Sequence, residues 1–599
     1  MRTGLLTDGG YPYATGESRL WCDRLVRGLD QHEFDVYALS RSAHQEASGR
    51  VELPPQVRRV RTAPLWTAPT AGRAYGRRDR RRFAGHFGEL AAAVCGGGPD
   101  FAAGLYGLAE LARERGGLHT ALRSETAVRA LESACRAPGA GRTVQAAGIP
   151  DHLAFAGLLE RALRPLSLDW YTEDGLGSVD LCHAAAGGTA ALPGLLAKRF
   201  FGVPLLVTEY GIQLRSHFLA GGDRSAPVRA LLAAFHRALA AEVYAQAAVI
   251  TPGNTHARRW QEKCGADPAK VRTVHPGMEA ARFTAVGEGA DPGDPATLVW
   301  VGRIEPAKDL ISLLHAFAEV RRQEPGAVLR IVGTPAEGPG GAAHLAHCRA
   351  LAAQLFPDEA AGAHAVGTNP VAFEEIGGPE APELADAYAG GAVVVLSSVV
   401  EGFPVSLVEA MFCGRATVST DVGAVVEVIG GTGLVVPPRN PRALADACLA
   451  LLRDPARRER LGAAARARAL ELFTVEQNLA AFRGIYLDLI SHCPVRRAPE
   501  HDTGEPRPFA HPAESHVPGN WTAGGGGPVR TPSWAWAGPG PGDGSLAGAG
   551  GGGTPGAVRV DGLRAGGLPV GVPAADARAV AVPVSRAAGA VAAMGEGGR

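Results

Sequence analysis

The sequence predicts an α/β protein with two doubly wound, Rossmann-like domains and a disordered C-terminal tail. Short apolar, valine-rich runs alternate with amphipathic helical segments in two separate blocks, which is typical of parallel sheets covered by helices. A loop rich in Gly, Asp and Pro at 286–295 separates the two blocks. Beyond Cys493, Pro, Gly, Ala and Ser dominate and aliphatic periodicity is lost. The predicted boundaries are 1–290 and 291–470 for the two domains, 471–493 for C-terminal helices and 494–599 for the tail.

The amino-acid composition argues against some classes of binding partner and indicates the cellular compartment. The 599 residues carry a formal net charge of zero, which argues against a nucleic-acid or anionic-membrane partner. The nine cysteines form neither CxxC pairs nor His/Cys clusters, so we expect reduced thiols and no metal site. We find neither a signal-peptide pattern nor an apolar run of about 18 residues. The expected protein is cytoplasmic and lacks a transmembrane segment.

The first block begins with a predicted strand at 2–7, which leads into a glycine-bearing loop at 8–16. Ligands of doubly wound sheets lie at the carboxyl ends of strands, so this loop is expected to border the binding site. The alternative is that its glycines form an ordinary turn. A second strand is predicted at 35–39. The stretch at about 41–165 is interpreted as a long, mostly helical insertion.

Three further strands are predicted in this block, at 179–183, 203–207 and 248–251. The first of them ends on His183. The second runs into Thr208, Glu209 and Tyr210. His183 is a candidate for contact with substrate, and the alternative is a core histidine whose hydrogen bonds are satisfied within the protein.

The second block opens with a predicted strand at 297–301, followed by Gly302 and Arg303, and a helix begins at Asp309. Arg303 and Lys308 therefore lie on one strand-to-helix loop. Two cations there can neutralise a diphosphate and stabilise it as a leaving group. The alternative is a pair of surface cations. The chain has only four lysines among its 60 Lys and Arg residues, which favours a specific role for Lys308.

The segment at 392–414 combines a buried strand, a short loop and a helix that Pro404 opens and Gly414 closes. Free N–H groups and the helix dipole make such a helix start an anion site. Glu401 and Glu409 frame it, and carboxylates there can accept hydrogen bonds from sugar hydroxyls. The arrangement suits a nucleotide sugar. The alternatives are a favourable helix N-terminal charge for Glu401 and a solvated helix face for Glu409.

With seven residues between them, Glu401 and Glu409 resemble the glutamate pair of retaining GT-B glycosyltransferases of family 4. The GR…K pattern at 302–308 and the segments EGFPVSLVEAM, CG and TDVG occur in the family's order. The first domain is most similar to glycosyltransferases of Pel-type exopolysaccharide synthesis. The similar features are GGYPYATG, Asp180 with His183, Thr208-Glu209, and TPGNTHARRWQEKCGADPAKVRTV.

This resemblance implies a GT-B fold, in which the two domains face each other across a cleft and the helices at 471–493 cross back to the first domain. It implies retaining transfer of a hexose from a nucleotide-diphosphate sugar, UDP-glucose in those relatives, to a saccharide or small-molecule acceptor. It implies no metal and no cofactor beyond the donor substrate. A cytosolic role in exopolysaccharide synthesis, associated with a membrane polysaccharide-export complex, is the corresponding expectation.

The resemblance also assigns roles. It gives the donor diphosphate to Arg303, Lys308 and the loop and helix start, the donor sugar to Glu401 and the ribose to Glu409. The remaining expected substrate-binding residues are Gly10, Gly16, His183, Tyr210, Gly302, Gly402, Phe403, Pro404 and Val405.

Two residues depart from the family's pattern. Tyr210 stands where relatives carry a histidine near the reacting centre, and it cannot supply a cation near neutral pH. Glu17 occupies a position where relatives have a second glycine pair. These departures keep open a degenerate glycosyltransferase that binds a nucleotide sugar or a partner without turnover. A sugar-nucleotide epimerase of the same fold is a further alternative, but it requires a general acid/base pair that we do not identify.

Overall fold

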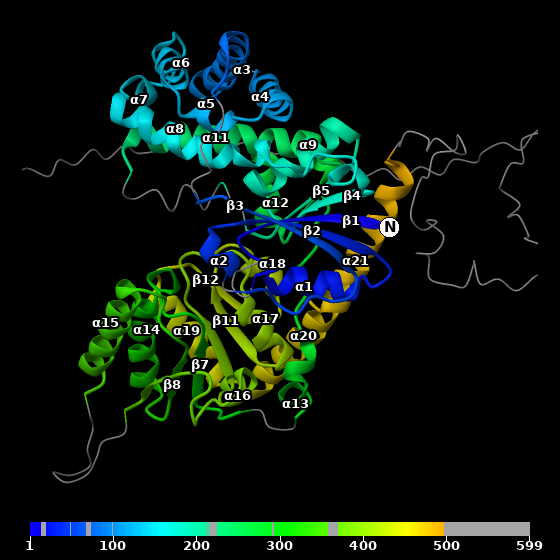
Figure 1. The fold of residues 1–599 in the computed structure, drawn as a ribbon. Coiled ribbons are helices and arrows are strands. Elements are labelled where there is room, and N and C mark those ends of the chain that lie inside the picture. Colours follow the sequence, from blue (N-terminus) through cyan, green and yellow to red (C-terminus); the bar gives the residue numbers. More distant parts are fainter. Residues whose placement is uncertain are drawn as a thin grey trace, which may run out of the picture. The chain divides into compact units, whose positions relative to one another are not determined.

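The computed structural model describes residues 1–13, 19–47, 49–67, 74–98, 100–211, 214, 224–289, 293–357 and 369–495. In this part of the chain, two six-stranded parallel sheets have the orders β3-β2-β1-β4-β5-β6 and β12-β11-β10-β7-β8-β9 (Figure 1). Each is the doubly wound Rossmann order, in which the strand order reverses at the middle of the sheet. The prediction of two Rossmann-like α/β domains is therefore confirmed. The predicted tail lies outside the described residues, apart from its first two.

The strands of the first sheet are β1 (Arg2–Asp8), β2 (Glu33–Ser40), β3 (Val57–Pro64), β4 (Leu181–Ala184), β5 (Leu205–Glu209) and β6 (Val249–Pro252). Those of the second are β7 (Thr297–Val301), β8 (Val328–Val332), β9 (Val371–Glu374), β10 (Val393–Leu396), β11 (Ala416–Thr420) and β12 (Leu434–Val436).

Helices cover both faces of each sheet, because alternate strand residues enter different cores. In β1, Leu6 belongs to one buried apolar cluster and Leu5 to another. In β7, Trp300 and Val299 divide in the same way. The continuous apolar runs in the sequence are thus strands that are buried on both faces.

The helices of the first half are α1 (Arg19–Gly28), α2 (Ala43–Ala47), α3 (Arg77–Gly96), α4 (Phe101–Arg115), α5 (Leu118–Leu122), α6 (Glu125–Arg136), α7 (Arg142–Gln145), α8 (Ile149–Leu163), α9 (Leu192–Phe201), α11 (Ala226–Gln246), α12 (Thr255–Lys263) and α13 (Thr284–Gly287). Those of the second half are α14 (Leu310–Gln323), α15 (Pro339–Leu355), α16 (Leu384–Ala389), α17 (Val405–Phe412), α18 (Val425–Ile429), α19 (Pro441–Leu452), α20 (Pro455–Leu472) and α21 (Val475–His492).

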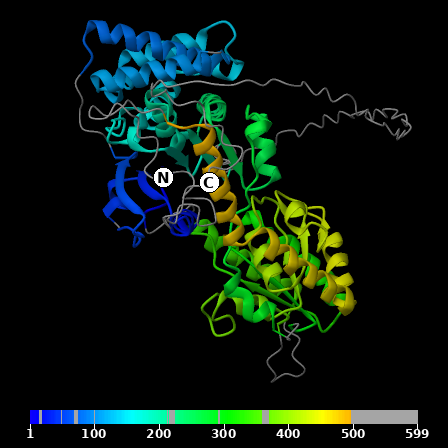
Figure 2. The same ribbon diagram turned by 90° about the vertical axis from the view of Figure 1, so that its right-hand side faces the viewer.

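The stretch at 41–165 is less uniformly helical than we expected. Helices α3 to α8 pack on one another and on α11, and they gather above the first sheet in both views (Figures 1 and 2). The same stretch also contains α2 and the edge strand β3, and β3 was not predicted. Its sequence, VRRVRTAP, has only one fully buried residue, so it carries no apolar run that would signal a strand.

Helix α21 follows the second sheet in the sequence but packs on the first sheet. Its Phe482, Tyr486 and Leu489 share a buried cluster with Leu5 and Phe34 of β1 and β2. In both ribbon views this orange helix lies beside the first sheet (Figures 1 and 2). The first sheet therefore obtains part of its apolar cover from the last described helix.

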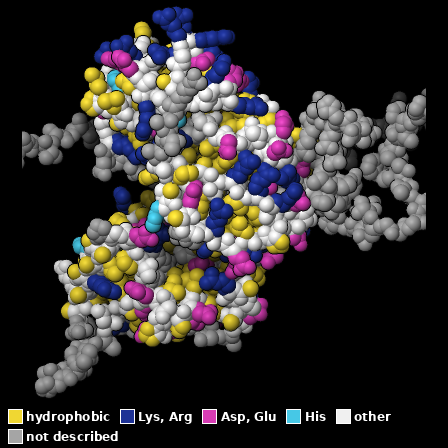
Figure 3. All heavy atoms as spheres, viewed as in Figure 1, with side chains coloured by type: hydrophobic (Ala, Val, Ile, Leu, Met, Phe, Trp, Pro, Cys, Tyr) yellow, Lys and Arg dark blue, Asp and Glu magenta, His cyan; other side chains and the backbone are white. Residues whose placement is uncertain are grey.

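The surface of the described residues carries charges of both signs, and basic and acidic side chains both occur on the face drawn in Figure 3. In the basic run at the start of α3, Arg82 pairs with Glu114 at 2.7 Å and Asp79 with Arg115 at 3.7 Å. None of the helices in the described residues is both long enough and apolar enough to cross a bilayer.

Gly333 is required by a close approach of two backbone segments. A Cβ atom at Gly333 would lie 1.8 Å from the carbonyl oxygen of Gly302. We expect Gly333→Ala to lower the free energy of unfolding by about 1–3 kcal/mol, since the backbone must shift to accept the methyl group. Gly85→Ala is the matched control, because this exposed glycine of α3 has open space around its Cα. The control should be neutral or stabilising by about 0.5–1 kcal/mol. Equal denaturant midpoints for both variants would contradict the argument.

Candidate functional site

A pocket of about 430 Å³ lies at the carboxyl ends of β7 and β8 and beside the start of α17. Strands β7 and β10 are neighbours at the point where the strand order of the second sheet reverses. Ligands of doubly wound sheets bind at this switch point. Seven of the residues that the sequence analysis singled out line the pocket: Gly302, Arg303, Lys308, Glu401, Phe403, Val405 and Glu409.

Lys308 is held in place by hydrogen bonds between the loops that follow β7 and β10. The Val399 N–H donates to the Ala307 carbonyl at 2.9 Å, and the Ser397 hydroxyl donates to the Lys308 carbonyl at 2.7 Å. Lys308 ends a short 3₁₀ turn, Pro306–Lys308. The backbone around Lys308 is thus fixed, and its side chain is directed to the loop that carries Glu401.

Glu401 and Lys308 form an ion pair within this site. The Lys308 ammonium donates to Oε1 of Glu401, and the Ser398 hydroxyl donates to the same oxygen at 2.9 Å. The side chains are only 9% and 19% exposed for Glu401 and Lys308. A pair this sheltered is screened less by solvent than a surface pair, and loss of one partner leaves the other charge poorly compensated. Glu401 is therefore not just a charge at an exposed helix start.

The turn between Glu401 and α17 is shaped by its neighbours. The carbonyl of Gly402 accepts a hydrogen bond from the Ala424 N–H at 3.1 Å. Gly423 adopts a φ of +58°, and a Cβ there would lie 2.5 Å from the Glu401 carbonyl oxygen. Pro404 is the N-cap of α17 and provides no capping side chain. The N–H groups of Val405 and Leu407 donate to the carbonyls of Phe403 and Pro404, so the start of α17 offers an anion mainly its positive dipole end. Gly402 and Pro404 build this turn without lining the pocket.

Glu409 lies one turn into α17 and is not on a solvated face. Its Oε2 accepts a hydrogen bond of 2.6 Å from the hydroxyl of Tyr388, a fully buried residue in the last turn of α16. Burial raises the pKa of Glu409, while the Tyr388 hydroxyl and the charge of Arg282 act in the opposite direction. Tyr388 was not singled out from the sequence, because a tyrosine in a short helix carries no pattern that connects it to Glu409.

Arg303 is the remaining cation of the pocket. Its side chain is exposed, and it forms no ion pair or hydrogen bond with another residue in the described part of the chain. The pocket therefore offers one guanidinium that a ligand can engage without breaking an existing bond. Thr334, Ile376 and Leu384 complete the opposite wall, and these residues also escaped the sequence analysis.

His183, which was expected to contact substrate, is a core residue. It is 0% exposed, and both ring nitrogens are bonded: Nδ1 with the Tyr486 hydroxyl and Nε2 with the Thr208 hydroxyl, each at 2.7 Å. Burial lowers the pKa of His183 to about 3, so the ring stays neutral. The structure thus contradicts a direct contact with substrate and favours the alternative of a satisfied core histidine.

The other first-domain candidates have different outcomes. Tyr210 directly follows β5 and is half-buried. Its hydroxyl accepts a hydrogen bond of 2.9 Å from Nδ2 of Asn478, and its ring packs edge-on against Trp21. Burial raises the pKa of Tyr210, so the hydroxyl stays protonated. Gly10 is buried in the turn after β1, where its carbonyl accepts the Tyr13 N–H at 2.9 Å. Gly16 and Glu17 lie outside the described residues.

A carboxylate at the end of β1 was not among the sequence candidates. Burial raises the pKa of Asp8 to about 6, although the charge of Arg41 acts against this shift. Asp8 ends the central strand of the first sheet, beside the point where that strand order reverses. Among the described residues, no group of three or more His, Cys, Asp or Glu side chains has the geometry of a metal site.

Comparison with known families gives one match for each half of the chain, and each match spans one of the two sheets. Residues 1–269 match a family described as a domain of unknown function (DUF3492), and residues 295–454 match the family "Glycosyl transferases group 1". The second match covers the whole of the pocket described above.

Among solved structures, a sucrose-phosphate synthase from Thermosynechococcus elongatus aligns with a TM-score of 0.48 and 18% identity, over 82% of this chain and 99% of that one. Anabaena Alr3699/HepE in complex with UDP and glucose aligns with a TM-score of 0.47 and 14% identity, over 82% of this chain and 100% of that one.

Sequence relatives include D-inositol 3-phosphate glycosyltransferases. The protein from a Nocardioides species is 31% identical over 306 residues, which are 49% of this chain and 64% of that protein. The protein from Frankia alni is 32% identical over 317 residues, which are 50% of this chain and 71% of that protein. Residues 295–454 match the family "Glycosyl transferases group 1", and the Frankia alni relative is 32% identical over 71% of its own length. The chain therefore belongs to the group 1 glycosyltransferases.

Proposed function

We propose that the protein is a metal-independent, retaining glycosyltransferase that moves a hexose from a nucleotide-diphosphate sugar to a saccharide or small-molecule acceptor. One observation carries the proposal: a single pocket at the switch point of the second sheet brings together Arg303, Lys308, Glu401, Glu409 and the start of α17. This set combines cations for a diphosphate with carboxylates for hydroxyl groups.

Each group has a chemical task in that reaction. Arg303, Lys308 and the positive dipole end at the start of α17 take up the charge that develops on the departing nucleotide diphosphate. Glu401 accepts hydrogen bonds from the donor sugar, and Glu409 accepts them from the ribose. In the absence of donor, Lys308 and Glu401 neutralise each other. Donor binding exchanges this ion pair for contacts of Lys308 with phosphate and of Glu401 with hydroxyl groups.

Retention proceeds by attack of the acceptor on the face from which the diphosphate leaves, so no protein nucleophile is assigned. UDP-glucose is the proposed donor. A cytoplasmic role in exopolysaccharide synthesis, associated with a membrane export complex, is the proposed context. These finer assignments rest on the resemblance of the first-domain motifs to enzymes of Pel-type exopolysaccharide synthesis.

Calorimetric titration of UDP-, GDP- and ADP-glucose in the presence of EDTA tests the proposal, followed by an assay of donor hydrolysis. We expect one nucleotide to bind selectively and slow hydrolysis to follow without metal. Binding without any turnover would favour the degenerate, non-catalytic alternative. Absence of binding to all three donors would contradict both. Full activity only after addition of a divalent cation would refute the metal-independent mechanism.

The Tyr388 hydroxyl gives a prediction for pH dependence. Because it lowers the pKa of Glu409, Tyr388→Phe should raise that pKa further. The ionised carboxylate is present above its pKa and is lost as the pH falls through it. Affinity for UDP-glucose should therefore fall at a higher pH in Tyr388→Phe than in the wild type, measured by calorimetry from about pH 8 to about pH 5.

Tyr244→Phe is the matched control for this experiment. Tyr244 also donates a 2.6 Å hydrogen bond to a buried glutamate, Glu209, but in the first domain. Its replacement should leave the pH profile of donor binding unchanged. Superimposable profiles for Tyr388→Phe and the wild type would rule out an effect of Tyr388 on Glu409.

A further inference from the structure

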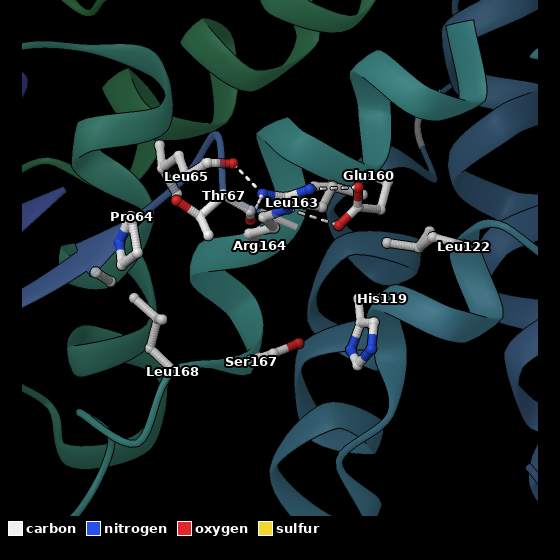
Figure 4. A pocket seen from close by; sticks show the side chains of 11 residues that line it. Pro64, Leu65, Thr67, His119, Leu122, Glu160, Leu163, Arg164, Ser167 and Leu168 are labelled. Carbon is white, nitrogen blue, oxygen red and sulfur yellow. Dashed lines mark hydrogen bonds and ion pairs between the residues drawn. The ribbon is translucent and has the colours of Figure 1, made fainter. Parts of the chain in front are cut away.

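A second pocket, of about 280 Å³, lies in the first half of the chain, away from the residues assigned above. Figure 4 shows it between the end of β3, helix α5, and helix α8 with the short turn Arg164–Ser167 that follows it. Its walls are mainly apolar. Leu65, Leu122 and Leu163 are buried, and Ala63 and Leu168 add to the apolar lining.

The charged groups in the wall of this pocket, Arg164 and Glu160, are bonded to each other and to further protein groups. Arg164 donates to both oxygens of Glu160, from Nε at 2.7 Å and from Nη2 at 3.0 Å. Its Nη1 donates to the carbonyls of Leu65 and Thr67. Glu160 is 0% exposed and also lies 3.4 Å from Arg123. The charged groups have already satisfied one another, so they offer little to a charged ligand.

Three uncharged polar side chains also line the pocket, those of Thr67, His119 and Ser167. His119 of α5 is half-buried and Ser167 is exposed, and in Figure 4 the Ser167 hydroxyl points toward the His119 ring. Apolar walls with few polar groups at the rim are typical of sites for small uncharged molecules. Preformed apolar cavities of smaller size bind benzene, which supports this assignment.

The position in the sheet connects this pocket to the reaction. Asp8 of β1 lies in register with Leu39 of β2, and Leu39 with Ala63 of β3. Two inter-strand spacings separate Asp8 from Ala63, or about 10 Å. Asp8 ends the strand at the switch point of the first sheet, where a ligand of that domain is expected. This separation between the two backbone positions is short enough for one small molecule to bridge.

We propose that this pocket binds a small uncharged, mainly apolar substituent of the acceptor, such as a phenyl or short alkyl group, while a hydroxyl of the same acceptor lies at the carboxyl end of β1. The identification of this ligand as the acceptor rests on the proposed function. The pocket's preference for an uncharged apolar group rests on its walls alone.

Binding of indole to the full chain tests the pocket directly, by calorimetry or ligand-observed NMR. Ser167→Trp places a large ring at the rim from an exposed position, so the fold should tolerate it, and thermal melting checks this. Thr67→Trp places a ring at a second exposed position of the lining and removes the hydrogen bond that the Thr67 hydroxyl accepts from the Ala43 N–H at 3.2 Å, so thermal melting checks this variant as well. Thr143→Trp, on the exposed face of α7, is the matched control. We expect indole binding to weaken at least about tenfold in both rim variants and to be unchanged in the control.

Two outcomes would overturn the pocket assignment: no indole binding to the wild type, or equal binding to the wild type and both rim variants. The acceptor assignment has its own readout, which needs no turnover. Phenyl β-glucoside should bind at least about tenfold more tightly than methyl β-glucoside, and Ser167→Trp should abolish the difference. Equal binding of the two glucosides to the wild type would refute the acceptor role even if indole binds. Failure of donor binding, by contrast, would refute the proposed function and leave the indole result intact.

Discussion

Replacement of Lys308 by methionine should lower kcat for donor cleavage by about a hundredfold to a thousandfold, the cost of losing one preorganised charge at a developing anion. Lys308 is one of two cations that line the pocket of the second domain, and it is the ion-pair partner of Glu401. Its loss leaves Glu401 without its cation and, in the proposed mechanism, removes a charge from the diphosphate. The rate of UDP release from UDP-glucose measures the effect.

Two further variants distinguish a specific loss of catalysis at Lys308 from a general effect of removing a lysine. Lys308→Arg keeps the positive charge but replaces a compact ammonium by a planar guanidinium. We therefore expect its kcat to lie between those of the wild type and Lys308→Met. Lys263→Met removes an exposed lysine of α12 and should leave kcat unchanged. A Lys308→Met protein that folds and retains a kcat within about twofold of the wild type would exclude Lys308 from the transition state.

Glu409→Ala should weaken binding of UDP-glucose by about tenfold to a hundredfold, because a hydrogen bond to a charged group contributes about 1.5–3 kcal/mol. Oε2 of Glu409 already accepts the Tyr388 hydroxyl, so under the proposed function Oε1 is the oxygen that accepts a hydrogen bond from the ribose. A sharper readout uses UDP and 2′-deoxy-UDP. The wild type should prefer UDP, and Glu409→Ala should bind the two nucleotides equally.

The control for this change is Glu459→Ala, which removes an exposed carboxylate of α20. It should leave both affinities at the wild-type level. If Glu409→Ala still discriminated between UDP and 2′-deoxy-UDP as the wild type does, the ribose would have to contact another part of the pocket.

The fold and the pocket at the switch point of the second sheet were largely predictable because they depend on short-range patterns. The strands of β7 and β10 are continuous apolar runs, and the loops that follow them carry Arg303, Lys308 and Glu401 within a few residues. Parallel strands then bring these loops to one edge of the sheet. Sequence order and sheet topology together placed seven candidates around one pocket.

The features that escaped prediction depend on partners distant in sequence or on exposure. The unpredicted strands β3 and β9 lie at the edges of their sheets, where half-exposed residues replace the apolar run. Tyr388 acquires its role from a contact with Glu409, and His183 loses its expected role through contact with Tyr486, which is 303 positions away. No local pattern in the sequence reports such pairings.

The position of α21 has a consequence for how the chain folds during synthesis. The last strand of the first sheet, β6, ends at Pro252. Helix α21, which packs on one face of this sheet, begins only at Val475. At about 5–20 residues per second, the roughly 220 intervening residues take about 10–45 s to emerge from the ribosome. During that interval the face that carries Leu5 and Phe34 lacks its partners Phe482 and Tyr486. A chaperone that shields this apolar face should therefore associate with nascent chains that end between 252 and 475, and release them once α21 has docked.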